Sequence, residues 1–351
     1  MANYATTALA KAQVKASLQF GASETRKLTP SVMGLAISNQ NISIPRAEVE
    51  RVHANRVVDI NFLSKIAAGS ATGKTANHTG SIGDSSKVNL SYITHVETFS
   101  LPRKLADNNV YSYDELFYNQ YIQAWGNLIA RHDASALAYV VANRCQLTAA
   151  NLATPLVASG LGSSAWNDTL LALEINQANK NTRLQKAEQF MKARYFNGQY
   201  DVIADLGTNG DLQFLVNQGA GNAQNTAFQF GNSMVTATQS IISSDYNQGA
   251  FLILPKGGLA GINWNDTQNL KGIMSGENEV GTLTTDVCPL GYNVKADLSM
   301  YTKRADTSAD TVGGSTQDIL DQFELTLTIA YAVSPLTTTD DSVAHLVGLV
   351  S

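Results

Sequence analysis

The sequence has 351 residues, of which 44% are hydrophobic and only 15% are charged, and its formal net charge is −5. The acidic balance excludes a globally basic nucleic-acid-binding protein, and the hydrophobic content excludes a disordered chain. Because about 25% of residues are charged in an average protein and interfaces are depleted in Lys and Glu, the composition indicates that a subunit of an assembly must be considered.

Charge is distributed unevenly along the chain. Residues 1–30 hold four basic residues against one acid, namely Lys11, Lys15, Arg26 and Lys27 against Glu24. Residues 306–351 hold seven acids and no Lys or Arg. Two interpretations stay open: a solvated leader with a solvated tail, or a basic arm that docks on an acidic surface, for example that of a neighbouring subunit.

Neither secretion nor a membrane is indicated. Residues 1–20 contain no apolar run typical of a signal peptide, and no stretch reaches the length of about 18 apolar residues that a membrane span needs. The cysteines, Cys145 and Cys288, lack the spacing of a disulfide framework or a zinc site, so we expect both to be small buried hydrophobes. The chain is expected to fold in a reducing cytoplasm.

The first predicted element is a long β-hairpin. Val58, Ile60 and Phe62 alternate with polar residues in one strand, and residues 88–101 continue the alternation in a returning strand. Residues 67–87 between them are rich in Gly, Ser, Thr and Asn. Connections longer than about 12–15 residues are usually functional or flexible, so we expect this tip to project toward a neighbouring subunit.

A long helix is predicted from about 113 to about 147. Ser112 and Glu115 have the spacing of a capping box, in which two side chains satisfy free amides at a helix start. Apolar and aromatic residues then recur at spacings of three and four: Phe117, Tyr121, Trp125, Leu128, His132, Ala136 and Tyr139. Such a helix would be about 50 Å long. We expect it to span the protein, with Phe117, Tyr121 and Trp125 as core anchors.

Mixed elements follow. Residues 166–195 are predicted to be helical with one interruption, residues 200–206 and 250–254 to be buried strands, and residues 211–216 to be a short helix. Residues 323–331 alternate between apolar and polar side chains, which predicts a half-buried strand. There is no repeating βαβ unit and no internal repeat.

The glycine-rich segments do not predict a nucleotide site. Residues 69–75 resemble a P-loop, but only three residues separate its glycines instead of four, and the following residues cannot continue a helix. Residues 207–210 are too short for a dinucleotide fingerprint and are predicted to be a turn. Asp201 and Asp205 could pair for metal or acid/base chemistry, but without a His or Glu cluster we favour turn and surface roles.

The histidines also fail to form a catalytic or metal-binding pattern. The five of them are scattered, and His132 falls on the apolar stripe of the long helix, where we expect a hydrogen-bonded core or interface residue. No nucleophile elbow accompanies a triad. We therefore predict no catalytic residue, no metal and no cofactor, and interpret the protein as not an enzyme.

The order of elements resembles the Hong Kong 97-type major capsid protein of tailed double-stranded DNA bacteriophages. Residues 99–103 (Phe-Ser-Leu-Pro-Arg), leading into residues 112–144, look like the junction of that family's extended loop and spine helix. Residues 198–205 resemble the strand that enters the axial domain. Residues 323–335, followed by 344–347, resemble the terminal strand pair of the peripheral domain. The resemblance covers most of the chain and concerns element order and length.

The resemblance implies an α+β fold and a structural role. The implied divisions are an N-terminal arm (1–50), an extended loop (51–105), a peripheral domain (106–198) with the spine helix, an axial domain (199–318) and C-terminal strands that return to the peripheral domain (319–351). The implied function is a subunit that tiles an icosahedral shell as pentamers and hexamers around the phage genome. Such a chain is made in the host cytoplasm and resides in the virion.

The resemblance also implies partners. These are further copies of the chain, with portal, scaffold and decoration proteins and non-specific contact with packaged double-stranded DNA, but no membrane. The arm is shorter than the cleaved scaffolding segment of some family members, so we expect a separate scaffold protein or none. Inter-subunit contacts are assigned to basic residues of the arm and loop: Lys11, Lys15, Arg26, Lys27, Lys74 and Lys87. No matching motif assigns a crosslink to either loop lysine.

Two alternatives remain. One is another self-assembling protein, such as a tail-tube, sheath or surface-layer subunit, although the long helix pattern counts against a β-dominated tube. The other is an enzyme of unrecognised class. A deep pocket with converging polar groups and shifted pKa values would favour the enzyme.

Overall fold

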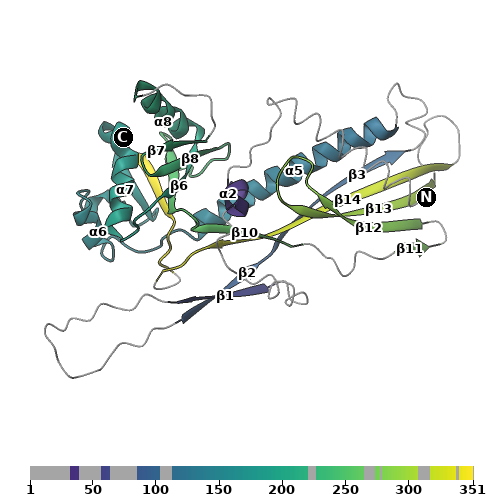
Figure 1. Cartoon of the computed structure of the whole chain (residues 1–351), viewed down its shortest axis with the longest axis horizontal. Helices are drawn as coiled ribbons and strands as arrows, with labels where there is room; N and C mark the ends of the chain where they lie inside the picture. The colour runs from purple at the N-terminus through teal and green to yellow at the C-terminus, as the bar shows by residue number, and fades with distance from the viewer. Residues whose placement is uncertain are drawn as a thin grey trace. The chain divides into compact units, whose positions relative to one another are not determined.

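The computed structural model divides the chain into two compact units, which are described separately (Figure 1). The described residues are 32–38, 57–63, 85–102, 113–219, 227–264, 273–276, 279–306, 317–336 and 340–350. Unit 1 takes its described residues from 92–133 and 262–330, and unit 2 takes them from 31–91, 134–261 and 331–351. Each unit is therefore assembled from stretches that are far apart in the sequence.

Unit 1 contains a sheet built around one long strand. The strands are β3 (Ile93–Pro102), β10 (Leu259–Trp264), β11 (Ile273–Gly276), β12 (Glu279–Val287), β13 (Lys295–Asp306) and β14 (Gln317–Val333). Their order is β10-β14-β13-β12-β11, and β3 also pairs with β14 in an antiparallel register. Phe323, Leu325 and Leu327 are buried while Glu324 is exposed, which confirms the half-buried strand predicted from the alternation.

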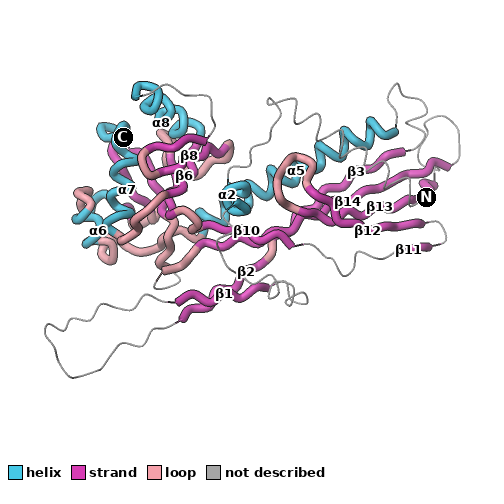
Figure 2. Tube along the Cα trace, in the orientation of Figure 1, coloured by secondary structure: helices cyan, strands magenta, loops and turns pink. Residues whose placement is uncertain are grey.

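Helix α5 (Tyr113–Ala142) is continuous over 30 residues (Figure 2). Its Phe117 ring lies 4.8 Å from Phe323 and 5.8 Å from Phe99, measured between ring centroids. The helix therefore covers the face of the sheet that β3 and β14 form in unit 1. At about 1.5 Å per residue it is about 45 Å long, and it ends at Ala142, somewhat before the predicted 147.

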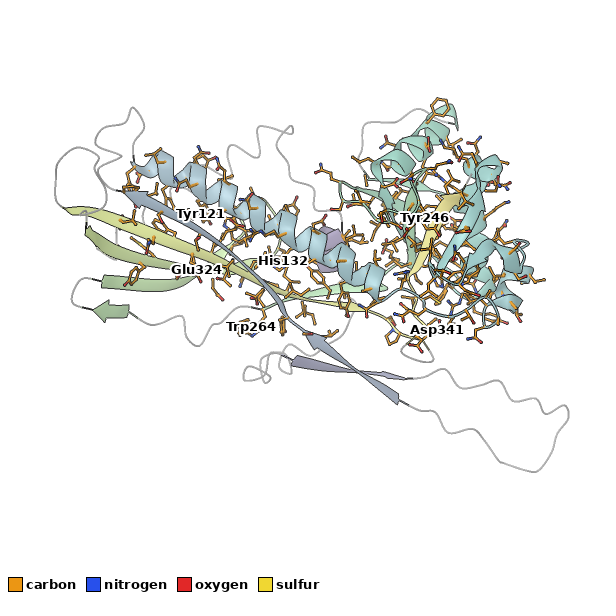
Figure 3. The ribbon with its side chains drawn as sticks, turned by 180° about the vertical axis from the view of Figure 1, so that it is seen from behind. Tyr121, His132, Tyr246, Trp264, Glu324 and Asp341 are labelled. Atoms are coloured by element: carbon orange, nitrogen blue, oxygen red, sulfur yellow. The ribbon has the colours of Figure 1, made fainter. Side chains whose placement is uncertain are left out.

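An aromatic row continues along α5 and forms the core of unit 1. Tyr121 follows Phe117 at a centroid distance of 5.7 Å, and Trp125 follows Tyr121 at 6.5 Å. All three side chains are at most 1% exposed, which confirms the predicted core anchors. Figure 3 labels Tyr121 and His132 along this helix. The proposed capping residue Ser112 lies outside the described residues.

Unit 2 contains a seven-stranded mixed sheet. Its order is β4-β5-β15-β9-β6-β8-β7. The strands are β4 (Trp166–Asn167), β5 (Ala172–Asn176), β6 (Tyr200–Asp205), β7 (Ala227–Phe230), β8 (Ser233–Thr238), β9 (Ala250–Pro255) and β15 (His345–Val350). β15 runs parallel to β5, and β6 runs parallel to β8. The strands predicted at 200–206 and 250–254 are thus central members of one sheet.

Unit 2 also contains short helices. They are α2 (Val32–Ser38), α6 (Ala153–Ala158), α7 (Arg183–Ala193) and α8 (Leu206–Gly219), with 3-10 helices η2 (Ser163–Ala165) and η3 (Gln177–Thr182). Leu184, Phe190 and Met191 of α7 join buried strand residues such as Phe251 and Val347 in one apolar core. Unit 2 also contains β1 (Val57–Leu63) and β2 (Ser85–Ser91), which form a separate two-stranded sheet.

Two predictions about unit 2 were wrong. Residues 172–176 are strand β5 and not helix, because β5 pairs in parallel with β15, far away in the sequence. Residues 207–210 are not a turn but belong to the first turns of α8, which continues directly from β6. Asp205 makes this continuation favourable, since its Oδ1 accepts a hydrogen bond from the Thr208 amide at 2.6 Å.

Candidate assembly surfaces

Only one of the basic residues predicted to make inter-subunit contacts lies among the described residues. Lys11, Lys15, Arg26, Lys27 and Lys74 lie outside the described residues. Lys87 lies in β2, where its register partner is Asn61 of β1. The assignment of these residues to inter-subunit contacts therefore stays a prediction. The P-loop-like segment and the tip of the hairpin also lie outside the described residues.

The β1–β2 hairpin has two faces of different chemistry. The strands pair antiparallel from Val57↔Ser91 to Leu63↔Ser85 (Figures 1 and 2). Because successive residues alternate between faces, this register places apolar residues together on one face: Val58, Ile60, Phe62, Val88 and Leu90. Asp59 and Asn61 share the opposite face with Lys87 and Asn89. In the part of the chain that the structure describes, no third strand pairs with this hairpin.

A second apolar surface lies on α8. Leu206 is 60% exposed and Phe214 is 62% exposed, and they are eight residues apart on one helix. Gly210 lies midway between them, and a Cβ built on it would have no atom within 4 Å. The inner face of the same helix carries buried residues such as Leu212. Sequence reasoning missed this surface because the glycines at 207 and 210 suggested a turn.

Unit 2 contains a buried polar cluster that fixes its last strand. Arg194, just after α7, forms an ion pair with Asp341, and its side chain and that of Asp341 are 7% and 9% exposed. The same guanidinium donates to His345 Nε2 and, at 3.3 Å, to Cys145 Sγ. His345 Nδ1 donates to the Val343 carbonyl at 3.1 Å. We call Arg194, Asp341, His345 and Cys145 the β15 clasp.

Burial dominates the pKa shifts of His345 and Cys145 in the β15 clasp. It lowers the pKa of His345 well below the ordinary value, and the neighbouring Arg194 lowers that pKa further. Burial raises the pKa of the Cys145 thiol, while Arg194 has the opposite effect on it. His345 therefore stays neutral, and Cys145 stays a thiol. Both cysteines are buried as predicted, with Cys145 at 0% and Cys288 at 5% exposure.

The two aspartates considered as a catalytic pair have structural roles. Asp201 is only 3% exposed, which corrects the predicted surface position, and its Oδ2 accepts from the Gly257 amide at 3.4 Å. Asp205 accepts from the amides of Thr208 and, at 2.7 Å, Ala250. Their carboxylates thus hold backbone segments in place. His132 is a hydrogen-bonded core residue as predicted, and its exposure is 0%.

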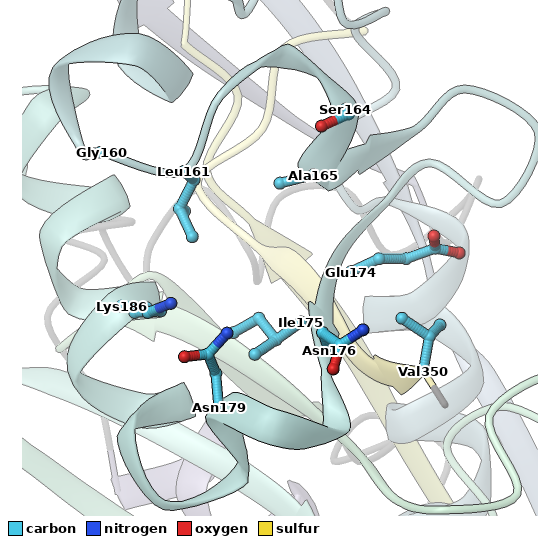
Figure 4. A pocket seen from close by; sticks show the side chains of 10 residues that line it. All are labelled: Gly160, Leu161, Ser164, Ala165, Glu174, Ile175, Asn176, Asn179, Lys186 and Val350. Atoms are coloured by element: carbon cyan, nitrogen blue, oxygen red, sulfur yellow. The ribbon is translucent and has the colours of Figure 1, made fainter.

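A cavity of about 320 Å³ lies in unit 2 between η2, β5 and α7 (Figure 4). Its polar lining includes Glu174, Asn179 and Lys186. Glu174 Oε1 already accepts from Asn167 at 2.7 Å and from the Tyr246 hydroxyl at 3.2 Å. Among the described residues, no group of three or more His, Cys, Asp or Glu could hold a metal ion.

Among the described residues, no helix is long and apolar enough to cross a membrane. Comparison with known proteins gives no match to any family model and none to any curated protein.

Solved structures do match the chain. It is similar to the capsid of cyanophage Pam1 at 9% identity and a TM-score of 0.48, over 84% of this chain and 85% of that chain. It is similar to the capsid of Ralstonia phage GP4 at 9% identity and a TM-score of 0.46, over 84% and 83%. It is also similar to a structure from Mycobacterium phage Adephagia at 11% identity and a TM-score of 0.44, over 94% of both chains. The first two are capsids, the class of protein that the sequence resembles.

Proposed function

We propose that the chain is the major capsid subunit of a phage. Copies assemble as pentamers and hexamers into an icosahedral shell that encloses the genome. The observation that carries the proposal is the amphipathic β1–β2 hairpin, which pairs with no other strand in the described part of the chain.

A two-stranded hairpin is at best marginally stable alone in water. Burying one large apolar side chain contributes about 1.5–3 kcal/mol. Leu90 of β2 is already buried within the chain at 1% exposure, so the hairpin gains further stability only where another surface covers the rest of its apolar face. A second copy of the chain supplies that surface. Repetition of the same contact around a symmetry axis then closes a ring, and rings close a shell.

The exposed face of α8 provides a second contact. Leu206 and Phe214 are large apolar side chains that remain more than half exposed. A contact between this face and a different face of the next subunit is heterologous, which is the kind of contact that generates rings of five and six. The basic residues of the arm and loop would add inter-subunit contacts. Portal, scaffold and decoration proteins and weak, non-specific contact with packaged DNA complete the proposed partners.

Electron microscopy and sedimentation of the purified chain test the proposal. We expect rings or closed shells from the wild-type chain. Ile60→Ser, on the apolar face of the hairpin, should leave a folded subunit that no longer assembles. Asn61→Ser is the matched control on the opposite face and should assemble normally.

Three outcomes would count against this function. A wild-type chain that remains a monomer of 37.5 kDa would contradict self-assembly of the chain alone. Tubes without closed shells would favour a tail-tube or sheath protein. Normal shells from Ile60→Ser would remove the hairpin from the assembly contacts.

A further inference from the structure

Two histidine rings meet in unit 1 where α5 packs on the sheet. The ring of His132 on α5 lies 4.6 Å from that of His95 on β3, measured between centroids, and the planes meet edge to face at 74°. His132 Nε2 is also 2.9 Å from the Leu327 carbonyl oxygen on β14. Because a carbonyl can only accept, Nε2 carries the proton of the neutral ring. His132 thus contacts both strands that α5 covers.

The charged groups around His95 and His132 do not favour an additional proton on either neutral ring. Arg131, adjacent to His132 on α5, lies 2.9 Å from Glu97 of β3, so the nearest carboxylate on that strand is already engaged. Arg131 also donates to the Val96 carbonyl at 3.2 Å. From β14 the group that faces His132 is the Leu327 carbonyl, and Asp321 on that strand lies about 20 Å further along. The remaining neighbouring charge on α5 is Asp133.

Titration follows from this environment. Burial lowers the pKa of His132 to about 4, His95 lowers it as well, and the hydrogen bond to Leu327 has an opposing effect. Burial and Arg131 also lower the pKa of His95. A proton on His132 would therefore place an almost fully desolvated cation beside a second titratable ring. α5 can pack against the sheet when both His95 and His132 are neutral.

We propose that His95 and His132 form an acid-sensitive contact that holds α5 on the β3–β14 face at neutral pH and releases it on acidification. In the open state, in which α5 is released from the sheet, His132 binds a proton below its ordinary pKa of about 6.5. In the closed state, in which α5 packs on the sheet, His132 binds a proton only near pH 4. The open state then binds more protons than the closed state. The closed state therefore loses stability as the pH falls from about 6.5 to about 4, and loses no more below that. This inference does not depend on the proposed capsid role.

Hydrogen–deuterium exchange of the full chain tests the contact. The readout is the protection of backbone amides in residues 117–132, corrected for the intrinsic pH dependence of exchange. Between pH 6.5 and 4 we expect protection to fall by up to about 300-fold, which corresponds to the pKa difference of His132. His132→Gln keeps an N–H donor for the Leu327 carbonyl but cannot take up a proton, so it should remove most of this fall. His78→Gln, outside the described residues, is the control for loss of one histidine.

The proposal is overturned if His132→Gln loses protection over the same pH range and to the same extent as the wild-type chain. Constant wild-type protection down to pH 4 would overturn it as well. Should His132→Gln not fold, His95→Gln leaves the buried ring in place and removes a neighbour that lowers its pKa. The loss of protection should then be smaller and should end at a higher pH than in the wild-type chain. An NMR titration of His132 in the wild-type chain tests the contact directly. A midpoint near 4 supports the contact, and a midpoint near 6.5 refutes it.

Discussion

The two units stabilise contacts between residues far apart in the sequence by different means. In unit 1, α5 lies on the sheet through tilted aromatic contacts such as Phe117–Phe323, and its Arg131–Glu97 ion pair leaves the Arg131 side chain 55% exposed. In unit 2, the Arg194–Asp341 pair is less than 10% exposed and belongs to the β15 clasp. Apolar burial is non-directional, whereas a buried ion pair is favourable only when its geometry is kept.

This difference indicates which of the two units can change its packing at low cost. Aromatic packing allows small shifts of α5 over its sheet at little cost, because most of the apolar area stays buried. The clasp allows no comparable shift, since Arg194 would lose Asp341, His345 and Cys145 together. For the proposed assembly as pentamers and hexamers, we therefore expect the subunit to vary within unit 1 and to keep unit 2 constant.

The largest effect is expected from breaking the clasp. Arg194→Ala leaves the buried Asp341 carboxylate without a cation, and we expect the free energy of unfolding to fall by about 3–5 kcal/mol. Urea denaturation followed by circular dichroism measures it. Arg194→Lys is the control, because it keeps the charge but cannot contact all three partners, and it should have an intermediate cost. A loss below about 1 kcal/mol for Arg194→Ala would show that the clasp does not stabilise unit 2.

A smaller effect is expected from overpacking the same unit. A Cβ on Gly348 of β15 would come closer than 3.0 Å to ring atoms of Tyr246. That ring cannot move freely, since its hydroxyl donates to Glu174 at 3.2 Å. Gly348→Ala should therefore destabilise the protein by about 1–3 kcal/mol. Gly210→Ala in α8, which has open space around it, should instead be stabilising by about 0.5–1 kcal/mol, and equal effects would contradict the rigid packing of β15.

The smallest effect is expected from the surface ion pair of unit 1. Arg131→Ala removes the partner of Glu97, but the Arg131 side chain is more than half exposed. The expected loss is less than about 1 kcal/mol and should shrink at high salt. The same urea titration measures it at low and high ionic strength. A loss as large as that of Arg194→Ala would remove the contrast between the units.

Elements with a strong local pattern could be predicted from the sequence. The spacing of Phe117, Tyr121 and Trp125 predicts one face of α5, and the alternation in residues 323–331 predicts the buried face of β14. The apolar residues at 58, 60 and 62 likewise predict a strand that pairs with a returning partner. For α5 and β14 the local period and the tertiary burial agree.

Features that depend on distant pairing could not be predicted. Residues 172–176 are equally compatible with a buried helix and a buried strand, and only pairing with β15 decides for the strand. Arg194 and Asp341 are 147 residues apart, and no spacing in the sequence indicates their contact. Asp205 looked like a turn residue, yet its carboxylate starts α8 by binding the Thr208 amide. The His95–His132 contact was missed for the same reason, although the burial of His132 was expected.

The place of β15 in the sheet has a consequence for synthesis. Of all the strands it comes last in the chain, yet it lies between β5 and β9. About 170 residues separate β5 from β15, so at a typical rate of translation the ribosome needs about 10–30 s to deliver the missing strand. A chain released early keeps two unpaired strand edges and cannot complete unit 2. The sheet of unit 2 can therefore close only after β15 has been translated.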